Sequence, residues 1–196
     1  SNGREAGLAA ARDAFYKGDI SRKIVDFQRK NGGWLTAEDL AGYASAIEPP
    51  VTFRYRGIDI YSCGPWCQGP VVPQALSLLE DFDLEAMGHN SPEYIHVVAE
   101  AIKLSFADRE RYYGDPKFVD VPIDTLLSSA YSVERRTQIR PDQAWRELPP
   151  AGSLDGIAGS GWTAPAADAG APTPVFAADT SYAAVMDREG NIFSAT

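Results

Sequence analysis

The chain has 196 residues, enough for one domain or somewhat more with a buried core. It carries 18 Lys and Arg against 27 Asp and Glu, a formal charge of −9 at pH 7, and its pI is about 4.7. This acidity argues against a nucleic-acid partner and against an anionic membrane surface, which both attract basic residues. Apolar residues make up 44% and charged residues 23%, as in globular proteins, and no stretch is suited to a transmembrane helix.

The first part of the chain predicts helices. Apolar residues keep helical spacing over 5–30, with a break at Gly18. Asp19 is a candidate N-cap for the second helix. One face of that helix carries three apolar residues: Ile20, Ile24 and Phe27. Thr36 and Asp39 have the spacing of a capping box, which predicts a further short helix.

The middle of the chain predicts one hairpin and three helices. Alternating residues over 51–61, with Gly57 between the two runs, indicate two strands and a tight turn. Ser91 as N-cap and Pro92 at the first helical position indicate a helix that runs to about Tyr113. Its expected apolar stripe consists of Ile95, Val98, Ile102 and Phe106. Two shorter helices are expected at about 74–80 and 130–139.

The last quarter of the chain differs in composition from the rest. Between Pro149 and Ala178, 19 of 30 residues are Ala, Gly or Pro, which predicts a poorly ordered linker over 149–178. Residues 182–195 then predict a hairpin with a Gly-containing turn. The sequence thus divides into a helix-rich part over 1–148, the linker, and a terminal segment over 179–196. The start at Ser1, typical of a segment added for expression, and the end inside an expected strand predict a piece of a longer protein.

Few residues are suited to metal or redox chemistry. The two cysteines, Cys63 and Cys67, have a C-x3-C spacing that differs from the C-x2-C of zinc and thioredoxin-like sites. The chain holds two histidines, His89 and His96, so a Cys/His cluster is not expected, and no metal or redox role is predicted.

A group of charged residues near the end of the long helix has two interpretations. Asp108, Glu110 and Asp115 lie close in sequence to Arg109 and Arg111, and they could form an acid–base set. The favoured interpretation is a solvated helix face. Because no Gly-rich phosphate loop is present, nucleotide chemistry has no support.

Thr180 opens the terminal hairpin directly after the linker, between Asp179 and Ser181. A threonine hydroxyl needs an adjacent base to act as a nucleophile, and its own α-amine can be that base once the preceding peptide bond is cut. On propensity alone, however, a threonine at the start of a strand is ordinary.

Several motifs, in order along nearly the whole chain, resemble the γ-glutamyltransferase (γ-glutamyltranspeptidase) family of N-terminal-nucleophile hydrolases. They are Gly32–Tyr43 (GGWLTAEDLAGY), Tyr55–Tyr61 (YRGIDIY), Glu100–Arg109 (EAIKLSFADR), Tyr113–Pro116 (YGDP), Phe118–Pro122 (FVDVP) and Asp179–Asn191 (DTSYAAVMDREGN). Two segments depart from the family pattern: Pro65–Pro70 (PWCQGP), in place of a PP-SSGG turn, and Ser181-Tyr182, in place of Thr-His.

The resemblance implies an α+β fold, a fragment of an αββα sandwich with a helix-rich part of the large subunit and the first hairpin of the small subunit. It implies autocatalytic cleavage between Asp179 and Thr180, with Thr180 as the catalytic nucleophile. The implied substrates are glutathione or a related γ-glutamyl donor, and water, an amino acid or a peptide as acceptor. The resemblance implies neither a metal nor an organic cofactor. The implied partners are the remaining parts of its own two subunits, and for a bacterial protein the family suggests a periplasmic or extracellular location.

Two alternatives remain open. The parent protein could be a β-lactam side-chain acylase that uses the same threonine. The chain could instead be a non-catalytic or degenerate relative that serves as a binding or structural domain.

Overall fold

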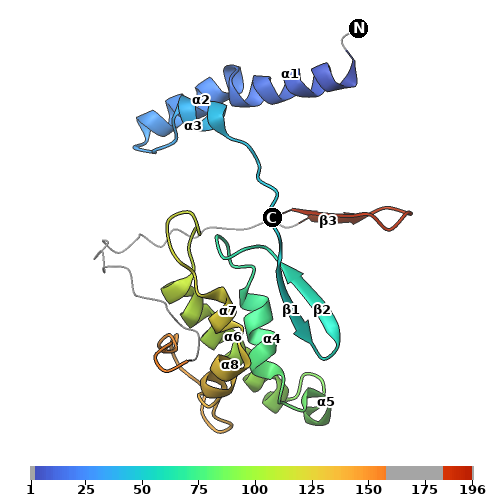
Figure 1. Cartoon of the computed structure of the whole chain (residues 1–196), viewed down its shortest axis with the longest axis vertical. Helices are drawn as coiled ribbons and strands as arrows, with labels where there is room; N and C mark the ends of the chain where they lie inside the picture. Colours follow the sequence, from blue (N-terminus) through green and yellow to red (C-terminus); the bar gives the residue numbers. More distant parts are fainter. Residues whose placement is uncertain (1–2, 158–182, 196) are drawn as a thin grey trace. The chain divides into compact units, whose positions relative to one another are not determined.

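The computed structural model describes residues 3–157 and 183–195. These residues form helices and two small antiparallel sheets of two strands each, so the expected mixture of helix and sheet is confirmed (Figure 1). The chain divides into two compact units, Ser1–Gly64 and Pro65–Thr196.

The first unit begins with three helices: α1 (Arg4–Tyr16), α2 (Asp19–Lys30) and α3 (Ala37–Gly42). The capping box at α3 is confirmed, because the Thr36 hydroxyl accepts from the Asp39 amide at 3.2 Å and the Asp39 carboxylate accepts from the Thr36 amide at 2.9 Å. The expected cap of α2 is wrong. The N-cap is Gly18, and Asp19 is the first helical residue, where its side chain pairs with Arg22 one turn on. The negative charge of Asp19 in the first turn still stabilises the helix, because it interacts favourably with the positive end of the helix dipole.

The expected hairpin of the first unit is confirmed as β1 (Val51–Tyr55) and β2 (Ile58–Ser62). Tyr55 pairs with Ile58, so the loop contains only two residues. Both have positive φ angles, 48° at Arg56 and 86° at Gly57. This is the backbone of a two-residue turn whose twist matches that of the strands, and glycine adopts it without a steric penalty.

The second unit is mainly helical, and its helices α4, α6 and α8 lie side by side (Figure 1). Its helices are α4 (Val71–Leu79), α5 (Leu84–Met87), α6 (Pro92–Tyr112), α7 (Ile123–Leu126) and α8 (Ser129–Arg136). The Ser91 hydroxyl caps α6 by accepting from the Tyr94 amide at 3.0 Å, as predicted. The four-residue helices α5 and α7 were not predicted, because so short a segment carries no readable periodicity.

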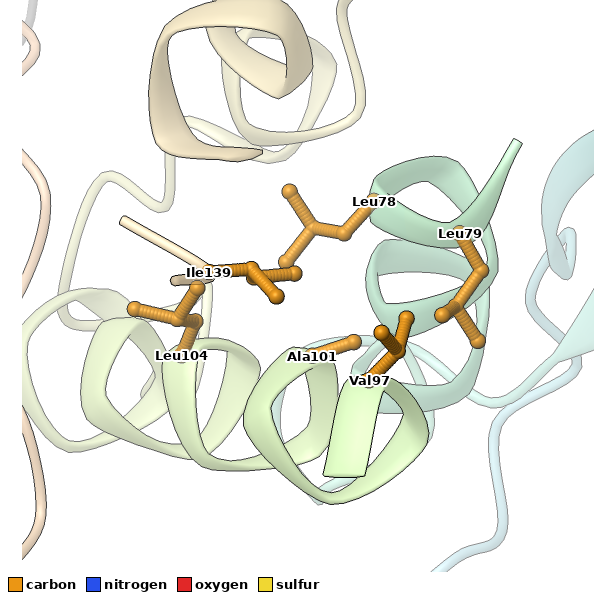
Figure 2. Packing of buried hydrophobic residues seen from close by; sticks show 6 residues of the cluster. All are labelled: Leu78, Leu79, Val97, Ala101, Leu104 and Ile139. Carbon is orange, nitrogen blue, oxygen red and sulfur yellow. The ribbon is translucent and has the colours of Figure 1, made fainter. Parts of the chain in front are cut away.

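The core of this unit lies between α4 and α6, and Figure 2 shows its side chains from both helices meeting around Ile139. The cluster consists of Leu78, Leu79, Val97, Ala101, Leu104 and Ile139. The apolar stripe predicted for α6 is therefore wrong at Ile95 and Ile102, whereas Val98 packs against the cluster as expected. Ile95 is 54% exposed and Ile102 is 42% exposed, whereas the buried face also carries Glu100, Ser105 and Asp108. The pattern was misleading because α6 buries polar groups that have partners, while it leaves apolar residues outside.

A second core cluster joins α6, α7 and α8 to the chain that follows them. It consists of Tyr112, Leu126, Tyr131 and Leu154. Leu154 is 6% exposed, and the partly buried Ala151 and Ile157 pack against the same cluster. The boundary expected at Pro149 thus falls within a stretch that packs on the helices up to Ile157, and the remainder of the expected linker lies outside the described residues.

The terminal hairpin is confirmed as β3 (Ala183–Met186) and β4 (Ile192–Ala195), with Met186 paired to Ile192. Among the described residues, no helix is both long and apolar enough to cross a membrane.

The corrected face of α6 can be tested by truncation. Leu104 is fully buried, so Leu104→Ala should lower the free energy of unfolding by about 2–5 kcal/mol through lost burial and a residual cavity. The matched control is Ile95→Ala on the exposed face, which should cost less than about 1 kcal/mol. Denaturant unfolding followed by circular dichroism measures both. A larger loss of stability for Ile95→Ala than for Leu104→Ala would instead support the stripe predicted from the sequence.

Candidate functional site

The predicted cleavage and catalytic residues, Asp179 and Thr180, lie outside the described residues. The nearest described element is the β3–β4 hairpin, which begins at Ala183, three positions after Thr180. That Thr180 directly precedes this hairpin is therefore known from the order of residues in the sequence.

The turn of this hairpin is held by one aspartate. The Asp187 carboxylate accepts from the Glu189 amide at 3.0 Å, from the Asn191 amide at 2.8 Å and from the Asn191 side-chain amide at 2.8 Å. These hydrogen bonds to the charged form, those from Asn191 first, lower the pKa of Asp187. Gly190 adopts a φ of 84° in the same turn. The register of the strand that follows Thr180 is thus set by local turn chemistry.

A buried polar cluster surrounds Asp108 on α6. Its carboxylate is fully buried and forms an ion pair with Arg135 of α8 at 2.9 Å. It also accepts three further hydrogen bonds: from Gln74 Nε2 at 2.6 Å, from the Tyr131 hydroxyl at 2.7 Å and from the Gly152 amide at 2.8 Å. We call these five residues the Asp108 network. It joins α4, α6 and α8 to the segment at 149–157.

The guanidinium of Arg135 completes the connection to this segment. It donates to the Pro150 carbonyl at 2.8 Å, to the Leu104 carbonyl at 3.3 Å and to Gln138 Oε1 at 2.9 Å. The Tyr112 hydroxyl donates to the Gly152 carbonyl at 2.5 Å. A Cβ at Gly152 would lie 2.2 Å from the Tyr131 hydroxyl, so only glycine fits there without rearrangement.

The electrostatics indicate that the Asp108 network stabilises the fold. Burial raises the pKa of Asp108, and the Arg135 charge and the hydrogen bonds from Gly152 and Tyr131 oppose this rise. Burial, and then the charge of Asp108, raise the pKa of Tyr113 and of Tyr131. The tyrosines therefore remain hydrogen-bond donors near neutral pH. Within the described part of the chain, no buried side-chain polar atom lacks a partner.

The charged residues near the end of α6 do not form one site. Asp108 points into the core, so the solvated-face interpretation is wrong for it. Arg109 pairs with the exposed Glu110, and Asp115 lies in the following turn, where its carboxylate accepts from the Lys117 amide at 2.9 Å. An acid–base set requires groups that reach a common substrate, which this arrangement does not provide.

The segment that departs from the family turn lines a shallow pocket of about 190 Å³ beside the end of α6. Its lining residues are Pro65, Trp66, Cys67, Arg109, Glu110, Tyr113 and Gly114. Both cysteines are free thiols, and the Cys67 sulfur accepts from the Gly69 amide at 3.4 Å. Among the residues that the structure describes, no group of three or more His, Cys, Asp or Glu is placed to hold a metal ion.

Comparison with known proteins places these features in one family. The model of the gamma-glutamyltranspeptidase family matches residues 5–196. The glutathione hydrolase proenzyme of Escherichia coli is 34% identical over 187 residues, which is 94% of this chain and 29% of the relative. The acylase ACY 1 proenzyme of a Pseudomonas species is 34% identical over 96% of this chain and 30% of its own length. The solved gamma-glutamyltranspeptidase of Helicobacter pylori is 36% identical, with a TM-score of 0.65 over 76% of this chain and 44% of that chain.

The chain therefore belongs to the gamma-glutamyltranspeptidase family of N-terminal-nucleophile hydrolases. Its α+β arrangement corresponds to part of the family structure. It spans about 30% of the length of the curated relatives that it matches.

The Asp108 network should be a major source of stability for the second unit. Asp108→Asn leaves the buried Arg135 without its counter-charge, so we expect a loss of about 3–5 kcal/mol in the free energy of unfolding. Asp115→Asn, at an exposed position, should change stability by less than about 0.5 kcal/mol.

Urea unfolding of both variants measures this difference. Tyr131→Phe, which removes a single donor, gives a milder second measurement, with an expected loss of about 1–2 kcal/mol. Equal stabilities for Asp108→Asn and Asp115→Asn would show that the buried pair contributes nothing.

Proposed function

We propose that the full-length protein is a proenzyme that cleaves itself between Asp179 and Thr180 and then transfers or hydrolyses γ-glutamyl groups. The observation that carries this proposal is that the family match extends through residue 196 and so includes Thr180. The relatives from Escherichia coli and Pseudomonas are themselves proenzymes. The hairpin that follows Thr180, with its Asp187 turn, supports the same assignment.

Cleavage and catalysis use the same hydroxyl in this mechanism. Thr180 Oγ attacks the carbonyl carbon of Asp179, the peptide nitrogen leaves as the α-amine of Thr180, and water hydrolyses the ester that joins the two residues. The freed α-amine then lies on the same residue as the hydroxyl and can accept its proton. Cleavage thus supplies the base that an internal threonine lacks.

The substrate step follows the same chemistry. Thr180 Oγ attacks the γ-carbonyl of a γ-glutamyl amide such as glutathione, forms a γ-glutamyl ester and releases the amine. Water then gives glutamate, whereas the amine of an amino acid or peptide gives a new γ-glutamyl compound. The remaining parts of its own two subunits complete the binding site for this donor.

A second candidate activity is the removal of an acyl side chain from a β-lactam. This candidate is supported by the similarity to the Pseudomonas acylase, which is as identical to this chain, at 34%, as the Escherichia coli hydrolase is. The same threonine ester mechanism applies, because both substrates are amides. What differs is the acyl group that the binding site accepts.

The role of Thr180 in cleavage and catalysis can be tested by comparing its substitution with that of the neighbouring Ser181. Full-length Thr180→Ala should remain a single polypeptide, while the wild type and Ser181→Ala should each give two fragments that meet between Asp179 and Thr180. Intact mass spectrometry identifies the bond. The hydrolysis of a γ-glutamyl anilide should fall at least about 1000-fold in Thr180→Ala. A Thr180→Ala variant that still splits at this bond contradicts the assignment.

The identity of the preferred acyl donor can be tested directly on the processed wild-type protein. We expect kcat/KM for glutathione to exceed that for an N-acylated β-lactam by at least about 100-fold, since a site that hydrogen-bonds one acyl group leaves polar groups unpaired with another. Product release measured by chromatography gives both values. The reverse ratio would select the acylase alternative, and no turnover of either substrate by a cleaved protein would favour a degenerate relative.

A further inference from the structure

The C-terminal end of α2 carries an asparagine that is followed directly by two glycines. Asn31 is the C-cap residue, and both it and Gly32 are exposed. Gly32 adopts a φ of 73°, in the left-handed region that glycine enters without a steric penalty. The Gly33 amide then donates to the Gln28 carbonyl at 2.8 Å, which is the outer hydrogen bond of a Schellman motif. The helix therefore ends in a tight glycine turn that begins at Asn31.

The backbone nitrogen of Gly32 is not engaged in this turn. A Schellman motif usually contains a second, inner hydrogen bond, which here would run from the Gly32 amide to the Arg29 carbonyl. That bond is not formed, and the Gly32 amide has no acceptor among the residues that the structure describes. A Cβ at position 32 would meet nothing within 4 Å. The nitrogen that directly follows Asn31 is thus neither hydrogen-bonded nor crowded by its surroundings.

These groups are the components of an intramolecular reaction. Once hydroxide removes the proton of the Gly32 amide, its nitrogen can attack Cγ of Asn31, and ammonia leaves as a succinimide ring closes. Water then opens the ring. Breaking the new bond to Cγ gives aspartate, whereas breaking the original peptide bond gives isoaspartate, in which the chain runs through the side chain. Either product places a carboxylate at the C-terminal end of α2, where the helix dipole disfavours negative charge.

We propose that Asn31 is a site of spontaneous deamidation, with the Gly32 nitrogen as the attacking group. The backbone must rotate away from the ψ of 14° at Asn31 to bring this nitrogen to the side-chain carbon. The hydrogen bond from the Asn31 side chain to the Phe27 carbonyl, at 2.8 Å, must also open. Both changes are confined to the last turn of a helix, where local opening costs least free energy.

The two other asparagines in the described residues are held in ways that oppose this reaction. Asn90 precedes Ser91, whose amide donates to the Gly88 carbonyl at 3.1 Å. Asn191 precedes the β-branched Ile192, and its side-chain amide donates to a carboxylate of its own turn at 2.8 Å. Because the same solvent and temperature act on all three asparagines, Asn90 and Asn191 are internal controls.

Incubation of the full-length protein at mildly alkaline pH, followed by peptide mapping, tests the proposal. Mass spectrometry should show a gain of about 1 Da at Asn31, in aspartate and isoaspartate forms that chromatography separates. The gain should accumulate at least about 10-fold faster at Asn31 than at Asn90 or Asn191, and it should slow at mildly acidic pH. Gly32→Ala should slow it at least about 10-fold, because a side chain hinders the approach of the nitrogen. Asn2, which also precedes a glycine, falls in a separate tryptic peptide.

Three results would overturn the proposal. Equal rates at Asn31 and Asn90 would show that the glycine turn has no effect. Aspartate without isoaspartate would indicate direct hydrolysis of the side chain, without the Gly32 nitrogen. A rate more than about 100-fold below that of the protein unfolded in guanidinium chloride would show that the folded protein protects Asn31. Cleavage at Asp179–Thr180 is read from other peptides, so this site and the proposed function are tested separately.

Discussion

The organisation of the second unit depends on a buried ion pair between Asp108 and Arg135. Taking these two charges out of water costs several kcal/mol for each ion, and their attraction alone does not reliably offset that cost. The pair is tolerated because Gln74, Tyr131 and the Gly152 amide complete the shell around the carboxylate. Since the partners come from three helices and the following segment, the helices and that segment must assemble together for any of them to be satisfied.

This constraint explains why the segment at 149–157 packs on the helices although its composition is unfavourable. Pro150 and Gly152 offer little apolar surface, but their backbone groups hydrogen-bond to Arg135, Tyr112 and Asp108. Leu154 then adds an apolar anchor in the second core cluster. Polar contacts from a rigid helical body can thus order a segment that hydrophobic burial alone would leave without structure.

The first unit presents the opposite situation. Its helices are well specified locally, by the capping box at Thr36 and by the charge of Asp19 at the start of α2. Its packing is sparse, because Ile20 and Phe27 of α2 are exposed and Leu40 is the one buried apolar side chain in α1, α2 and α3 among the described residues. These helices thus carry the information for their own ends in nearby side chains.

The sequence by itself determined the features whose causes are local. The caps at Ser91 and Thr36, the turn at Gly57 and the turn of the terminal hairpin each depend on side chains within a few residues of one another, and all were predicted. The family, too, could be identified from motifs, with Thr180 as its candidate nucleophile. The tertiary structure decided which face of α6 is buried and that Asp108 lies in the core. No periodicity could show this, because the burial of a carboxylate depends on Arg135, Tyr131 and Gly152, which are 23 to 44 positions away in sequence and meet it only when the chain folds.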